Sequence, residues 1–127
     1  MEIGSRRYGD VVVAAPVGRI DHANADRLTA ALVPLLDAGS PLLLDFSGVD
    51  YISSVGLRAL MMAAKTLRAQ QRTLGVAAPQ PVVREIFEIS RFNMILDVSP
   101  TLRAGLERLS AQAVAAFDAA AGAADGG

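Results

Sequence analysis

Two adjacent serines, Ser53 and Ser54, are the side chains of this sequence that are best placed for chemistry. They stand between a short apolar run and an amphipathic run, a pattern typical of a strand, a tight loop and a helix whose first residues carry hydroxyl groups. A serine at that place caps the helix by accepting a hydrogen bond from a backbone N–H. On the residues alone, capping is the simpler interpretation, but only one of the two serines can be the cap.

The other serine is then available for modification. If Ser53 caps the helix, Ser54 begins it and projects outward, and Gly56 leaves room for the active site of a partner to approach. A phosphate on Ser54 would add about −1.5 to −2 charges. It would lie at the positive end of the helix dipole, among free amide donors. We therefore expect phosphorylation to change the surface and the binding of a partner while leaving the fold almost unchanged.

A second candidate for phosphate chemistry is Asp45, near the end of the apolar run 42–46. An aspartate that ends a central strand is the phosphate acceptor of receiver domains. Such a site also needs an acidic pair after the first strand and a lysine that ends a later strand. Here Val11–Val17 is followed by Gly18-Arg19, and Lys65 falls inside a predicted helix. We therefore predict that Asp45 holds the following loop by accepting backbone hydrogen bonds.

Signatures of catalysis and of metal binding are missing from the sequence. There is no glycine-rich phosphate loop, no dinucleotide fingerprint and no nucleophile elbow. The sequence has no cysteine and one histidine, His22, which rules out a thiolate zinc site, a multi-histidine site and a disulfide framework. His22 follows Asp21 at a predicted helix start and is expected to be a solvated turn residue. We predict a protein that is not an enzyme, with no catalytic residue, cofactor or metal.

Composition narrows the class of protein further. The net charge of −1 and the 20% of charged residues give no basic field for nucleic acid. The longest apolar runs, Val11–Val17 and Leu42–Leu44, are too short to cross a bilayer, and no signal-peptide pattern is visible. We expect a cytoplasmic protein that neither binds nucleic acid directly nor inserts into a membrane. A chain of 127 residues can bury a core without disulfides.

The hydrophobic pattern predicts the elements that position the two serines. Strands are expected at residues 2–8, 11–17, 42–46, 73–77 and 94–98, the first two as a hairpin around Gly9-Asp10. The first helix is capped by Asp21 or Asn24 and bent or shortened by Pro34. A second helix follows the serines and a third covers residues 82–89. A last helix is expected from Ser99 as its cap, with Pro100 at the first helical position, to Leu109.

This order of elements predicts an α/β fold. After the hairpin, strands and helices alternate, so crossovers should produce a mixed, partly parallel sheet of about five strands packed against about four helices. Residues 1–110 are expected to form the domain. Residues 111–127 are rich in alanine and glycine and are expected to form a C-terminal extension, helical at first and frayed from Gly122 onward.

At the serines the sequence resembles the STAS domains of bacterial anti-sigma factor antagonists. The likeness runs from about Glu2 to Leu109 and implies the STAS fold. It is carried by four stretches: Gly18-Arg19-Ile20-Asp21, the strand and loop from Leu42 to Val49, Tyr51-Ile52-Ser53-Ser54-Val55-Gly56-Leu57-Arg58, and Ser90-Arg91-Phe92.

The resemblance implies a partner-switching regulator. Ser54 matches the phosphate acceptor of the family. The partner would be an anti-sigma factor that is also a serine kinase of the histidine-kinase-like ATPase type, and a PP2C-type phosphatase would reverse the modification. The unphosphorylated protein would bind the anti-sigma factor and free the sigma factor. The expected partner-binding residues are Asp21, Ser53, Val55, Gly56 and Arg58.

Two positions depart from the family pattern. Ser53 stands where many members have aspartate, and Val55 stands where many have serine, threonine or alanine. The first change removes an acidic neighbour of Ser54, and the second adds bulk beside it. An alternative therefore stays open, in which the chain is a binding module that does not switch. It would then serve as a subunit of a transport complex or as a sensor of a small ligand such as a nucleotide.

Overall fold

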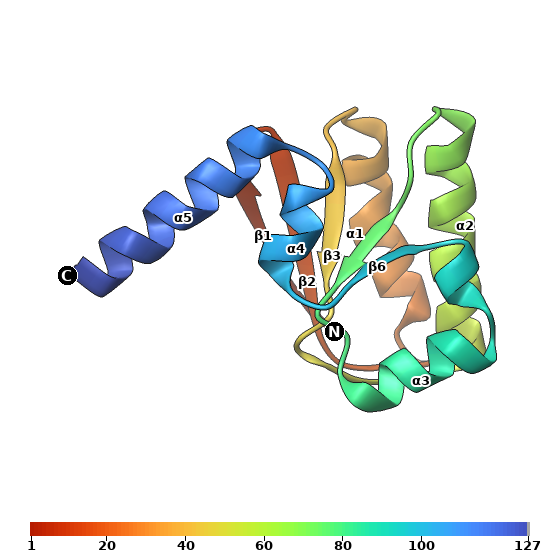
Figure 1. Ribbon diagram of the computed structural model, residues 1–127. Coiled ribbons are helices and arrows are strands. Elements are labelled where there is room, and N and C mark those ends of the chain that lie inside the picture. Colours follow the sequence, from red (N-terminus) through yellow and green to blue (C-terminus); the bar gives the residue numbers. More distant parts are fainter. Residues whose placement is uncertain (127) are drawn as a thin grey trace.

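The computed structural model describes the backbone of residues 1–126 and the side chains of residues 1–122 (Figure 1). Its strands are β1 (Glu2–Tyr8), β2 (Val11–Ile20), β3 (Leu42–Asp45), β4 (Val49–Ile52), β5 (Gly75–Ala77) and β6 (Asp97–Ser99). Its helices are α1 (Ala25–Asp37), α2 (Ser54–Ala69), α3 (Pro81–Ile89), the 3-10 turn η1 (Phe92–Met94), α4 (Leu102–Glu107) and α5 (Ala111–Gly126).

The strands form one mixed sheet in the order β1-β2-β3-β5-β6. β1 and β2 are the predicted antiparallel hairpin, and every other pair is parallel. β4 lies off this path and pairs with the last residues of β2, whereas β3 pairs with earlier ones. The prediction of an α/β fold with a hairpin followed by alternating elements is therefore confirmed.

The predicted number of strands was too low, because β4 was interpreted as a loop. This strand has only four residues, of which the outer two, Val49 and Ile52, are buried and the inner two are exposed. Such a pattern carries no clear strand period, so its formation depends on pairing with β2, a neighbour that is distant in sequence. β4 ends immediately before the two serines and therefore determines where they lie.

The predicted boundaries of the last strand and helix were also wrong. β6 begins at Asp97 instead of residue 94, because Phe92–Met94 form η1 after Arg91, whose φ of 61° is left-handed. Ser99 belongs to the strand. Thr101 caps α4, since its hydroxyl accepts a hydrogen bond from the N–H of Ala104 at 3.0 Å. α4 ends at Glu107, and α5 is a separate helix.

The sheet buries apolar side chains on both faces. Alternation along β2 directs Val12 and Ala14 to one core and Val11 and Val13 to the other. The larger core lies beneath α1, α2 and α3, on one side of the sheet in Figure 1. The smaller core includes buried residues of α4 and α5, which cover part of the opposite side. α2 therefore packs against one face of the sheet through this larger core.

Helix α5 is fastened to the sheet by its first half and projects beyond it (Figure 1). The rings of Phe117 and Tyr8 meet edge to face with centroids 5.4 Å apart. Arg103 donates to both carboxylate oxygens of Asp118 at 3.0 Å. The hydroxyl of Ser110 donates to Asp10 at 2.5 Å. α5 occupies most of the alanine-rich extension, and the division into a domain and an extension stays a prediction.

The contact between Arg103 and Asp118 has a defined pH dependence. Its hydrogen bonds lower the pKa of Asp118 below the ordinary value of 3.8. The stabilisation of α5 by this pair is therefore complete above pH 3.8 and is lost as the pH falls through the lowered pKa. Titration of the Asp118 carboxyl carbon by NMR should give a midpoint below 3.8, and Arg103→Gln should raise it towards that value. A midpoint that does not respond to Arg103→Gln would contradict the contact.

Candidate functional site

The two serines lie where β4 and β2 end side by side. Arg19 is paired with Tyr51, and Ile20 with Ile52. The N–H of Ser53 then donates to the carbonyl of Ile20 at 2.9 Å. This last bond places the start of α2 against the loop that follows β2, which contains Asp21. Two segments that are about 30 residues apart in the sequence therefore form one surface.

Ser53 is the helix cap, and Ser54 is the free serine. Ser53 has an extended backbone, and its hydroxyl accepts a hydrogen bond from the N–H of Gly56 at 3.3 Å. Its carbonyl accepts the N–H of Leu57 at 2.9 Å. Ser54 is the first helical residue and is exposed. Within residues 1–122, the Ser54 hydroxyl has no hydrogen-bond partner.

Gly56 is required inside the protein, which corrects the interpretation that it opens space for a partner. The residue is buried. A Cβ atom on it would lie 2.7 Å from side-chain carbons of both Ile20 and Ile52. Those distances are shorter than contacts between carbon atoms allow. The absent side chain therefore lets the first turn of α2 pack directly on the ends of β2 and β4.

The rim of the site joins aromatic, apolar and charged side chains. The guanidinium of Arg19 lies 4.5 Å from the ring centroid of Tyr51, a cation–π geometry. Nε of Arg19 is also 3.6 Å from a carboxylate oxygen of Asp21. On α2, Val55 is 45% exposed, and Arg58 is exposed one turn after Ser54. Sequence reasoning missed Arg19 and Tyr51, because their pairing depends on β4.

The loop that carries Asp21 is held by its own side chains. Asp21 accepts a hydrogen bond from the N–H of Ala23 at 2.9 Å. Asn24 accepts from the N–H of Asp21 at 2.9 Å and donates to the carbonyl of Arg19 at 2.6 Å. Asn24 occupies the cap position of α1, but its side chain makes no capping bond there. The polar residues predicted as caps therefore fix the loop beside Ser53.

The start of α2 has the electrostatic properties of an anion site. No acidic residue lies in its first turn. Ser53 satisfies the N–H groups of Gly56 and Leu57, which leaves those of Ser54 and Val55 at the open end of the helix. Arg58 adds a positive charge on the next turn. A phosphate on Ser54 would find these donors without breaking a hydrogen bond of the protein.

The other sequence candidates lie apart from this chemistry. Asp45 accepts a hydrogen bond from the N–H of Ser47 at 3.0 Å, as predicted for a residue that holds the loop. Lys65 is exposed on α2, and His22 is exposed in its turn. Across the part of the chain that the structure describes, no group of three metal-ligating side chains occurs. Nor does this part contain a helix long and apolar enough to cross a membrane.

Comparison with known proteins gives a consistent result. The family model described as STAS domain matches residues 2–105. A protein of Bordetella bronchiseptica named "Putative anti-sigma factor antagonist BtrV" is 38% identical over 100 residues, which cover 78% of this chain and 86% of that protein. These matches confirm the resemblance that the residues around Ser54 indicated.

Solved structures share the fold. The crystal structure of an anti-sigma factor antagonist from Mycobacterium paratuberculosis is 26% identical, with a TM-score of 0.78, and the match covers 85% of this chain and 92% of that one. The murine Slc26a9 anion transporter is 17% identical, with a TM-score of 0.67 over 80% of this chain and 18% of the transporter. At that identity the second likeness concerns the fold alone.

The two serines should respond differently to removal of their hydroxyl groups. Ser53→Ala removes the cap and should lower the free energy of unfolding by about 1 kcal/mol. Ser54→Ala removes no hydrogen bond and should change it by less than about 0.5 kcal/mol. Urea unfolding of both variants measures the difference. A larger loss for Ser54→Ala than for Ser53→Ala would contradict this assignment of the cap.

Gly56→Ala should destabilise the protein, although alanine normally favours a helix. The new methyl group would overlap Ile20 and Ile52, and such overpacking costs about 1–3 kcal/mol. Gly122→Ala in α5 is a matched control, because a Cβ there meets no atom within 4 Å. That variant should unfold no more easily than the wild type. Equal stability of Gly56→Ala and Gly122→Ala in urea would show that the start of α2 is not tightly packed.

Proposed function

The chain belongs to the STAS domain family, and we propose that it is an anti-sigma factor antagonist whose binding is switched off by phosphorylation of Ser54. The observation that carries this proposal is the division of roles between the two serines. Ser53 holds the helix through its hydroxyl, and Ser54 presents a free hydroxyl one residue later. The second hydroxyl can therefore be modified without removing the bond that fixes the first turn.

The modification would act on the surface and leave the fold intact. A phosphate of about −1.5 to −2 charges at the first residue of α2 is stabilised by the helix dipole and by the two free N–H groups. Arg58 is the nearest cation on the helix itself. No acidic residue in the first turn of α2 opposes the new charge. We therefore expect the phosphorylated protein to fold as well as the unmodified one.

Phosphorylation of Ser54 would weaken binding because it changes the charge of the surface that the partner contacts. In the unmodified protein, the surface around the start of α2 includes the exposed side chains of Val55 and Arg58, the ring of Tyr51 with Arg19 above it, and the loop of Asp21. A partner surface that packs against a neutral hydroxyl and a valine would have to desolvate a dianion after phosphorylation. The carboxylate of Asp21, in the loop beside the start of α2, has the same sign of charge as the phosphate. The protein would therefore bind its partner when Ser54 is unmodified and release it when Ser54 is phosphorylated.

The predicted partner-binding residues have two kinds of role in this proposal. Asp21, Val55 and Arg58 present side chains at the surface and would touch the anti-sigma factor. Ser53 and Gly56 would act by fixing the position of α2, through the cap and through close packing. The partners would be an anti-sigma factor kinase of the histidine-kinase-like ATPase type and a PP2C-type phosphatase. The protein itself would be a cytoplasmic regulator without catalytic activity.

Intact-mass spectrometry with peptide mapping tests the switch. The protein is incubated with ATP and the anti-sigma kinase encoded nearest to it, beside Ser54→Ala and Ser47→Ala. Ser47 is an exposed serine in the loop before β4, so its variant is the matched control. We expect one phosphate on the wild type and on Ser47→Ala, and none on Ser54→Ala. The modified peptide should carry the phosphate on Ser54 and not on Ser53.

Two other results would contradict the proposal in different ways. Tight binding of the anti-sigma factor with no phosphate transfer would show an antagonist that does not switch. Absence of both binding and phosphate transfer would remove the antagonist function, and would favour a subunit of a transport complex or a ligand sensor.

A further inference from the structure

A groove of about 480 Å³ runs along the free edge of β6. Its lining residues lie between Arg84 and Arg108, well after the first turn of α2 in the sequence. Within the described backbone, residues 1–126, β6 ends the sheet and pairs with β5 alone. In Figure 1, α3 and α4 lie on either side of this strand. The α3 wall includes Arg84 and Glu88, and the other wall includes Pro100 and Arg108. The volume lies in the range of pockets that hold small ligands or short peptides.

The backbone of Val98 is free to pair with an added strand. The N–H of Asp97 donates to Leu74, and the carbonyl of Ser99 accepts from Ala78, each at 2.9 Å. In a parallel ladder, successive residues of a strand direct their backbone N–H and C=O groups alternately to one side and the other. Because Asp97 and Ser99 bond towards β5, the N–H and C=O of Val98 face away from β5 and towards the groove. Val98 lines that groove. An extended peptide laid along β6 would satisfy both groups, which is how strands are added to sheet edges.

Ser99 supplies a second unused group. Ser99 is a polar residue buried to 2% exposure, and it lines the groove. Within residues 1–122 the hydroxyl of Ser99 makes no hydrogen bond, and this oxygen is not completely shielded from solvent. Buried polar groups normally have a partner, and a bound peptide would supply one.

The α3 wall carries two charges that form no ion pair within the described side chains. Arg108 on the opposite wall is bound to Asp97 at 2.7 Å, whereas Arg84 and Glu88 have no such partner. These two residues are one helical turn apart, a rise of about 6 Å. Alternate side chains of an extended peptide are about 6.6–6.8 Å apart. The wall therefore matches a peptide with opposite charges on residues two positions apart.

We propose that the groove along β6 binds an extended peptide that pairs with Val98 and carries an acidic and a basic residue two positions apart. α3 and α4 wall the strand edge, so a single extended segment can enter and a whole sheet cannot. The groove uses β6, α3 and the residues Pro100 and Arg108 on either side of α4, whereas the phosphorylation site uses β2, β4 and α2. This second surface does not depend on the function proposed for Ser54.

Titration of the isotope-labelled protein by NMR with two blocked pentapeptides tests the proposal. The peptides are Val-Asp-Val-Lys-Val and Val-Lys-Val-Asp-Val, which differ only in the order of their charges. We expect the wild type to bind one of them about fivefold more tightly, the size of effect that two exposed ion pairs give. The amide signal of Val98 should shift on binding, and that of Ser54 should not.

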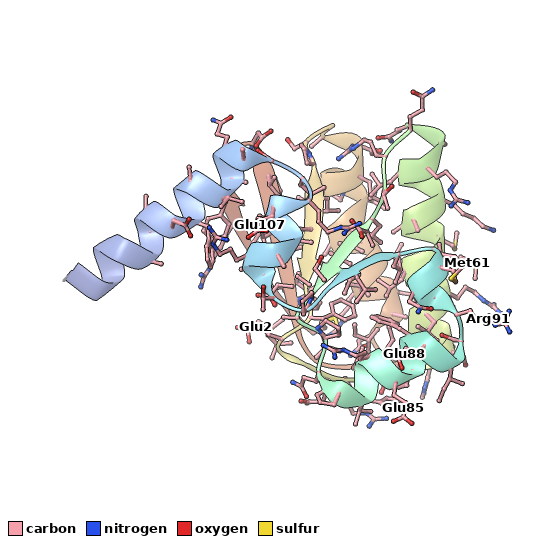
Figure 2. All side chains as sticks on the ribbon, in the orientation of Figure 1. Glu2, Met61, Glu85, Glu88, Arg91 and Glu107 are labelled. Atoms are coloured by element: carbon pink, nitrogen blue, oxygen red, sulfur yellow. The ribbon has the colours of Figure 1, made fainter. Side chains whose placement is uncertain are left out.

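Exchange of the two charges on α3 provides the decisive variant. The double variant Arg84→Glu, Glu88→Arg should prefer the other peptide by a similar factor. Glu85→Arg changes a charge on α3 that does not line the groove and should keep the wild-type preference; Glu85 and Glu88 are both labelled in Figure 2. A Val98 amide that both peptides leave unmoved at millimolar concentration would overturn the proposal. So would an unchanged preference in the double variant.

Discussion

The pairing of β4 with the end of β2 is the constraint on which the candidate site depends. It joins Ile52 to Ile20, and the hydrogen bond from Ser53 to Ile20 continues it into the loop. Gly56 completes the contact, because only a residue without a side chain lets the first turn of α2 approach these strands so closely. The pairing brings Asp21, Arg19 and the start of α2 to one surface. Without it, two short polar segments would lie on unrelated loops.

This constraint also explains why two adjacent serines can differ in role. Ser53 follows the last residue of β4 and keeps an extended backbone, and its hydroxyl accepts a hydrogen bond from the N–H of Gly56. Ser54 already has helical geometry, so its side chain leaves the protein. One serine is thus committed to structure and the next is available for chemistry. A negative charge on the second is compatible with the fold because the helix N-terminus attracts it.

Much of the fold could be predicted from the sequence, because long apolar patterns determine it. The hairpin, β3, β5 and the first three helices follow from local periodicity and turn residues. β4 could not be predicted in this way, since a four-residue strand takes its identity from a distant partner. Thr101 caps α4 in place of Ser99 for a similar reason: pairing of Ser99 with β5 extends the strand to the position where local rules place the cap. The sequence singled out the two serines, and the structure shows that Ser53 caps α2, whereas the pair Arg19 and Tyr51 and the inward role of Gly56 required the three-dimensional arrangement.

The most direct test of this account compares two properties of the same two samples. Calorimetric titration measures the affinity of the anti-sigma factor for the unmodified protein and for the protein phosphorylated on Ser54, and urea unfolding measures the stability of both. The account predicts that phosphorylation weakens binding by at least about a hundredfold, equivalent to about 2.7 kcal/mol, while the free energy of unfolding stays the same or rises. Equal affinities would contradict the switch. A large loss of stability that accompanies the loss of binding would show that the phosphate acts by disrupting the fold.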